Sequence, residues 1–90
     1  MASLSSIGSS GLQAAQLRLD ASTNNVANAN TPGYRRLSVA QQAVADSAGV
    51  RATVEREANE KGVALEQEAV EQMSATYAFK ASLQTIKTQD

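Results

Sequence analysis

The chain has 90 residues, a formal net charge of −1, one Phe, two Tyr and no Trp. This length allows one small domain, near the lower limit for a self-sufficient core. Because the apolar content is mainly Ala, Val and Leu, we predict that the protein associates with partners or with further copies of itself. The absence of Cys and His excludes disulfides, thiol chemistry, imidazole catalysis and the usual zinc ligands. The near-neutral charge gives no electrostatic reason to expect a nucleic acid or an anionic membrane as partner.

Enzymatic function finds little support in the residue pattern. The serines have no His to activate them, and no Gly-Xaa-Ser-Xaa-Gly motif is present. The carboxylates from Glu55 to Glu71 are spread along the chain among Arg and Lys, which favours a solvated face over a metal site. We therefore predict that the protein is not an enzyme and has no catalytic residue, cofactor or metal.

The sequence also bears on the route by which the chain travels. No apolar run approaches the roughly 20 residues of a membrane span, so no membrane insertion is predicted. Residues 1–8 have neither a basic n-region nor an apolar h-region, so they are not a cleaved secretory signal. If the protein leaves the cytoplasm, another export route must carry it.

The first predicted element is a helix over residues 3–29, with apolar and small residues at the spacing of a coiled-coil seam. The seam consists of Leu12, Ala15, Leu19, Ser22 and Val26. Gly8 and Gly11 each lower helix propensity by about 1 kcal/mol relative to Ala, so the first turns should be ordered only when something packs against them. The Gly- and Ala-rich face permits close approach of a second helix.

A turn motif over residues 30–36 ends this helix. Pro32 fixes its own φ and excludes Thr31 from the α region, and Gly33 accepts positive φ, so residues 31–34 predict a type II turn. A helix stop followed by a turn explains these residue types by itself. Arg35 and Arg36 are assigned to a solvated surface or, in an assembly, to the carboxylates of a neighbour.

The middle of the chain predicts a short β-hairpin over residues 37–57, with 37–44 paired to 50–57. Residues 50–56 alternate apolar and polar side chains, and residues 46–49 are a turn cluster. Residues 41–45 are equally compatible with a helix. Residues 58–62 form a polar connector.

A second helix over residues 63–88 carries an apolar stripe wide enough to touch two neighbours. Acidic residues lie in its first turns, and Lys80 and Lys87 lie toward its other end, as the helix dipole favours. The predicted fold is a single mainly α domain, residues 1–90, in which two long terminal helices form an antiparallel coiled-coil-like pair with the hairpin between them.

The helix stripes also predict an assembly interface, because two helices and a hairpin leave part of each stripe uncovered. The residues assigned to this interface are Leu12, Leu19, Val26, Leu65, Val70, Met73, Tyr77, Leu83 and Ile86. Leu12, Leu19 and Val26 are expected to face the second helix either within one chain or between chains. A homo-oligomer or a swapped assembly of the isolated protein is therefore expected.

The turn motif resembles the N-terminal signature of the bacterial flagellar axial proteins, the rod and hook family. The residues that carry this resemblance are Asn24, Asn25, Val26, Ala27, Asn28, Thr31, Pro32, Gly33 and Tyr34. Gly11-Leu12 and Ala14-Ala15 are placed as in the family. The second helix is similar to the family's closing helix at Val63, Leu65, Glu66, Val70, Met73, Tyr77, Ala81, Ile86, Lys87 and Thr88.

The resemblance implies a structural subunit of the flagellar basal-body rod, whose terminal helices assemble into the axial tube needed for motility. Its implied partners are other rod and axial subunits, further copies of itself and the flagellar type III export apparatus. The implied location is the periplasm-spanning rod. The short middle segment favours a small proximal-rod-like protein over a hook protein. The alternative is a coiled-coil adaptor or export-related binding protein that uses the same scaffold outside the rod.

Overall fold

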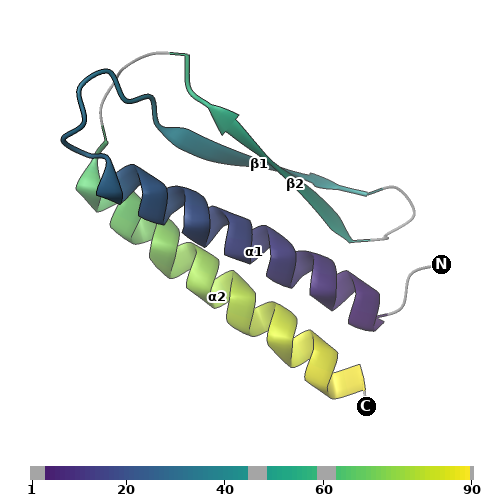
Figure 1. The fold of residues 1–90 in the computed structure, drawn as a ribbon. Coiled ribbons are helices and arrows are strands. Elements are labelled where there is room, and N and C mark those ends of the chain that lie inside the picture. Colours follow the sequence, from purple (N-terminus) through teal and green to yellow (C-terminus); the bar gives the residue numbers. More distant parts are fainter. Residues whose placement is uncertain (1–3, 45–48, 59–62, 90) are drawn as a thin grey trace.

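The computed structural model describes residues 4–44, 49–58 and 63–89. The elements follow in the order α1 (Leu4–Ala27), β1 (Leu37–Ala43), β2 (Val50–Arg56) and α2 (Leu65–Gln89). The two helices lie side by side and antiparallel, and the β-hairpin covers α1 on the side away from α2 (Figure 1). This is the predicted mainly α fold with a hairpin between two long helices. The predicted turn residues 46–48 and the connector residues 59–62 lie outside the described residues.

The helices pack closely because α1 presents small residues to α2. A Cβ atom added at Gly8 would lie 2.7 Å from Ile86 Cγ1 and 3.2 Å from the Ser82 carbonyl oxygen. A Cβ added at Gly11 would collide with Ser82 Oγ. The close approach predicted from the Gly- and Ala-rich face is therefore present, and any larger side chain at Gly8 would force the helices apart.

The buried centre of the chain is small and partly polar. Its buried apolar residues are Ala14, Ala15, Ala21 and Ala75, whereas its largest fully buried side chains are Glu68, Asn25 and Ser22. The face of α1 against α2 therefore runs through Gly8, Gly11, Ala15, Ser22 and Asn25. This corrects the predicted seam. Ala15 and Ser22 belong to both the predicted and the observed seam, whereas Leu12, Leu19 and Val26 lie outside the observed one. Small residues occupy the interface because they allow the two helices to lie closer together than leucines would.

The hairpin is antiparallel and pairs Leu37 with Arg56 through to Ala43 with Val50. Bonds from Glu57 N to Arg36 O at 2.8 Å and from Val44 N to Gly49 O at 2.9 Å continue the ladder at its two ends. The hairpin prediction is thus confirmed, and residues 41–43 are strand rather than helix. Ser10 Oγ of α1 accepts a hydrogen bond from Val50 N at 3.1 Å, which ties β2 to α1.

The turn motif after α1 also has the predicted geometry. Tyr34 N donates to Thr31 O at 3.2 Å, and Gly33 has a φ of 75°, as the third residue of a type II turn requires. Asn28 Nδ2 donates to Asn24 Oδ1 at 2.7 Å and so bridges the end of the helix to the residue that follows it. Neither α1 nor α2, as far as the structure describes them, combines the length and the hydropathy of a membrane span.

Candidate functional site: a buried polar cluster and an exposed face of α2

Asn25, in the last turns of α1, holds the start of β1 through its side chain. Its Oδ1 accepts a hydrogen bond from Leu37 N at 2.7 Å, and its Nδ2 donates to Leu37 O at 2.8 Å. The carboxamide thus pairs with both backbone groups of Leu37, much as the backbone of a neighbouring strand would. Since Asn25 is only 1% exposed, this pairing fixes the direction in which the chain leaves the turn.

Tyr34 completes the link between the turn and this asparagine. Its hydroxyl donates to Asn25 Oδ1 at 2.8 Å. The guanidinium carbon of Arg56, at the end of β2, lies 5.3 Å from the centre of the Tyr34 ring, and Arg56 Nη1 donates to Arg35 O at 2.7 Å. The turn motif is therefore bonded to both α1 and β2. The side chain of Asn25 makes the link to α1.

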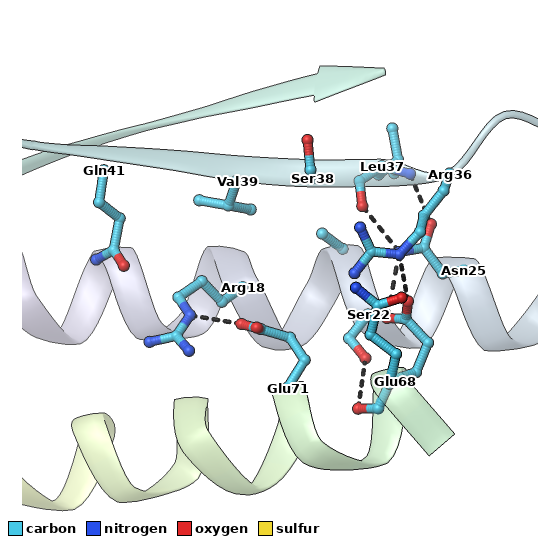
Figure 2. Close-up of a pocket in the computed structure, with 12 residues that line it drawn as sticks. Arg18, Ser22, Asn25, Arg36, Leu37, Ser38, Val39, Gln41, Glu68 and Glu71 are labelled. Carbon is cyan, nitrogen blue, oxygen red and sulfur yellow. Dashed lines mark hydrogen bonds and ion pairs between the residues drawn. The ribbon is translucent and has the colours of Figure 1, made fainter. Parts of the chain in front are cut away.

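Glu68 of α2 is the charged centre of the cluster. Its side chain is fully buried, and its Oε2 accepts a hydrogen bond from Arg36 Nε, while its Oε1 accepts one from Asn25 Nδ2 at 3.3 Å (Figure 2). Arg36 Nη1 also lies 3.5 Å from Glu57 Oε1. Glu68 was predicted on a solvated face and Arg36 on the surface or against a neighbour, and both predictions are wrong because the two side chains pair inside the chain.

The charge state of Arg36 follows from these contacts. Burial disfavours its charged form, but the hydrogen bond to Glu68 and the charges of Glu68 and Glu57 outweigh that effect, so the pKa of Arg36 is raised above its ordinary value. Arg36 therefore stays protonated at every accessible pH. A buried ion pair of this kind fixes geometry rather than adding much stability, because desolvation offsets its attraction.

Polar contacts continue from this cluster along the two helices. Ser22 Oγ donates to Glu68 O at 3.3 Å and accepts from Gln72 Nε2 at 3.1 Å. One turn further, Arg18 Nε donates to Glu71 Oε1 at 2.6 Å, and Arg18 Nη2 donates to Ser74 Oγ at 2.9 Å. Figure 2 shows Arg18, Ser22 and Glu71 of this series where α1, α2 and β1 meet. They set the register of the two helices, which the small buried apolar centre alone does not determine.

The opposite face of α2 carries large apolar side chains that the chain itself leaves exposed. Val70, Met73 and Tyr77 are 66%, 73% and 78% exposed. Met73 and Tyr77 line a shallow groove together with Ala69, Gln72, Thr76 and Lys80. We refer to Val70, Met73 and Tyr77 as the exposed α2 row.

The structure divides the predicted interface residues into two groups. Val26, Leu65 and Leu83 are exposed, as is the exposed α2 row, whereas Leu12, Leu19 and Ile86 are half-buried. The pairing of Leu12, Leu19 and Val26 with Val70, Met73 and Tyr77 is therefore not made within the chain. A pairing between chains stays a prediction.

Within the described ranges, no group of three or more Asp or Glu side chains is placed to hold a metal ion. The polar groove beside the cluster is lined by Arg18, Arg36, Glu68 and Glu71, whose charges are already paired with one another. The polar cluster therefore positions the elements of the fold.

Sequence reasoning did not find the contacts of Asn25 with Leu37 or of Glu68 with Arg36. Asn25 was singled out for its place in the turn motif and Glu68 for its place near a helix N-terminus. A signal was present in the spacing, because Glu68, Ala75 and Ser82 repeat every seven residues and so lie on one face of α2. A heptad of small and polar residues opposite Gly8, Ala15 and Ser22 indicates a close helix pair with a polar end.

The fold and these contacts define a class of protein: a small helical hairpin, held in register by buried polar contacts, that presents an uncovered apolar helix face. Residues 6–35, which include most of α1 and the turn motif, match the family described as flagella basal body rod protein. The resemblance indicated by the turn motif is thereby confirmed over residues 6–35, about a third of the chain, which are similar to flagellar basal body rod proteins. No curated protein shows significant similarity to the chain. The likeness of α2 to the family's closing helix lies outside the matched segment and stays a prediction.

Proposed function

We propose that the protein is a structural subunit of the flagellar basal-body rod and assembles with other rod subunits through the exposed α2 row. The observation that carries this proposal is the division of α2 into two faces. One face is bonded to α1 by small and polar residues, whereas the other presents Val70, Met73 and Tyr77 to solvent. Contiguous exposed apolar side chains of this size are typical of an interaction site.

The exposed α2 row has enough apolar surface to drive assembly. Full burial of a side chain such as Val or Met contributes about 1.5–3 kcal/mol, so three such side chains supply roughly 4–9 kcal/mol before the cost of association. In a rod, each subunit makes this kind of contact with several neighbours, and the contacts together hold it in place. The groove beside Met73 and Tyr77 suits a helix from an adjacent subunit, because a ridge of side chains fits the groove of a facing helix.

Assembly is coupled to ordering in this account. Among the residues that the structure describes, the buried apolar ones are few and all Ala, so the free chain gains much of its burial from neighbours. A chain of this kind is suited to export in an unfolded state through the flagellar type III apparatus. We infer that the rod formed in this way spans the periplasm and that the subunit is needed for motility.

The test uses single substitutions in a strain that lacks the native gene. Met73→Glu places a charge in the exposed α2 row, and Gln67→Glu adds the same charge at another exposed position of α2. We expect Gln67→Glu to restore swimming and Met73→Glu to fail, although both purified proteins keep the helical circular dichroism of the wild type. Normal swimming of the deletion strain, with the protein found only in the cytosol, would instead support the adaptor alternative.

A further inference from the structure

The two outer edges of the β-hairpin differ in what covers them. In an antiparallel pair, hydrogen-bonded and non-hydrogen-bonded residue pairs alternate. The bonds from Glu57 N to Arg36 O and from Val44 N to Gly49 O show which pairs are bonded within the hairpin. The backbone groups of Leu37, Val39 and Gln41 in β1, and of Ala52 and Val54 in β2, therefore point outward from the sheet.

The outer edge of β1 is closed at its start, whereas residues 41–43 are exposed. Asn25 occupies both backbone groups of Leu37. Val39 and Gln41 line the polar groove, where Arg18, Gln67 and Glu71 lie beside the strand. Figure 2 shows this side of β1 facing the two helices. A further strand cannot approach the start of β1 without displacing the Asn25 side chain.

The outer edge of β2 is open over its second half. Ser10 caps only Val50, at the start of the strand. From Thr53 to Arg56 the residues are exposed, and β1 is the one strand paired with β2 in the described part of the chain. An open strand edge of this kind is a template for another strand, unless its side chains oppose the partner.

The side chains of β2 are compatible with one partner strand, β2 of a second copy. Two copies placed antiparallel about Thr53 set Arg51 of each copy opposite Glu55 of the other, so the contact has two ion pairs. The same register places Ala52 opposite Val54, whose outward backbone groups then bond, and leaves Thr53 facing Thr53 in a non-hydrogen-bonded pair. Moving the centre to Ala52 or Val54 separates Arg51 from Glu55. β1, by contrast, carries no charged residue that would select a register.

We propose that β2 pairs with β2 of a second copy of this chain, antiparallel and centred on Thr53, to form a four-stranded sheet. The two-fold axis is perpendicular to that sheet, so both copies of α1 lie on the same face of it. Strands are about 4.8 Å apart, which places the midlines of the two hairpins about 10 Å apart, the usual spacing of packed helices. The groove between α1 and β2, lined by Gln13, Gln16 and Leu17, then receives α1 of the second copy.

This dimer is distinct from rod assembly. A two-fold contact closes on itself, whereas subunits that add along a rod use a contact between different surfaces. The dimer also uses β2 rather than the exposed α2 row, so it does not depend on the proposed function. It is a form of the free subunit.

A single cysteine tests the pairing directly, because the chain has no Cys of its own. Thr53→Cys places two thiols in a non-hydrogen-bonded pair, whose Cα separation of about 4.5 Å lies within the range of a disulfide. The control is Gln42→Cys, which is exposed on β1 but far from the two-fold axis. On mild oxidation of the full-length protein, we expect a disulfide-linked dimer from Thr53→Cys and monomer from Gln42→Cys.

The charges supply the second readout. Arg51→Glu or Glu55→Arg, each in the Thr53→Cys background, replaces two attractions by two repulsions and should weaken dimerisation about tenfold or more. The two reversals together should restore it, which excludes loss of folding as the cause. Equal crosslinking at positions 53 and 42, no dimer at position 53, or single reversals without effect would each overturn the proposal. An assembly made only through α2 would give the first of these outcomes.

Discussion

Replacing Glu68 by Ala should remove a large part of the free subunit's stability. Glu68 is fully buried, and the side chain of Arg36 that it binds is only 15% exposed. The substitution leaves the guanidinium without its buried partner and removes the acceptor for Asn25 Nδ2. Removal of one member of a buried pair typically costs about 3–5 kcal/mol. A domain of this length has roughly 5–13 kcal/mol in total, so the loss is a large part of it.

The assay is thermal and urea unfolding followed by circular dichroism. Since 1 kcal/mol changes the Tm of a domain of this size by about 4–8 °C, Glu68→Ala should lower Tm by at least about 12 °C. The control is Glu71→Ala, one turn away, which removes the ion pair with Arg18. The side chain of Glu71 is 33% exposed, so this pair is screened by solvent and its loss should cost about 1 kcal/mol or less.

A double substitution separates a buried pair from an ordinary packing defect. Arg36→Met combined with Glu68→Met removes both charges at similar volume and should recover most of the stability that either single change loses. If Glu68→Ala costs no more stability than Glu71→Ala, Arg36 does not depend on a buried partner. A double substitution as unstable as the sum of the single ones would show a packing defect instead of a buried ion pair.

Two further predictions concern the same contacts. Asn25→Asp keeps the acceptor for Leu37 N but loses the donor to Leu37 O and brings a second carboxylate to Glu68. The free energy of unfolding should therefore fall by about 1–3 kcal/mol. Urea unfolding measures this, and wild-type stability would contradict it. Gly8→Ala raises helix propensity by about 1 kcal/mol, but its Cβ meets Ile86 and the Ser82 carbonyl, so Tm should fall, and Ile86→Ala in the same chain should recover part of the loss. A rise in Tm for Gly8→Ala alone would show that the helices are not in close contact.

The sequence was sufficient where local chemistry decides the structure. Pro32 and Gly33 define the turn, because their φ preferences do not depend on the rest of the chain. The hairpin followed from alternation in residues 50–56 and from turn residues ahead of it. The two long helices followed from periodicity, and their antiparallel pairing from the coiled-coil spacing of the stripes on both.

The helix seam was not predicted correctly because hydrophobicity was given more weight than size. Leu12 and Leu19 are the more apolar choices, but Gly8, Gly11 and Ala15 allow a closer approach and occupy the interface. The contacts of Asn25 with Leu37 and of Glu68 with Arg36 join residues that are far apart in sequence. Asn and Glu at helix ends usually have local roles, so a place near a helix end does not indicate a buried partner. For Glu68, only the seven-residue repeat with Ala75 and Ser82 places it on the buried face of α2.

Isolation of intact basal bodies tests the central proposal most directly. The strain lacking the gene is supplied with the wild type, Gln67→Glu or Met73→Glu, and the protein is quantified in the purified basal bodies and in the cells. We expect incorporation of the wild type and of Gln67→Glu, and loss of Met73→Glu from the basal bodies despite equal amounts in the cells. Basal bodies that lack the wild-type protein, or that contain Met73→Glu at the wild-type level, would contradict it.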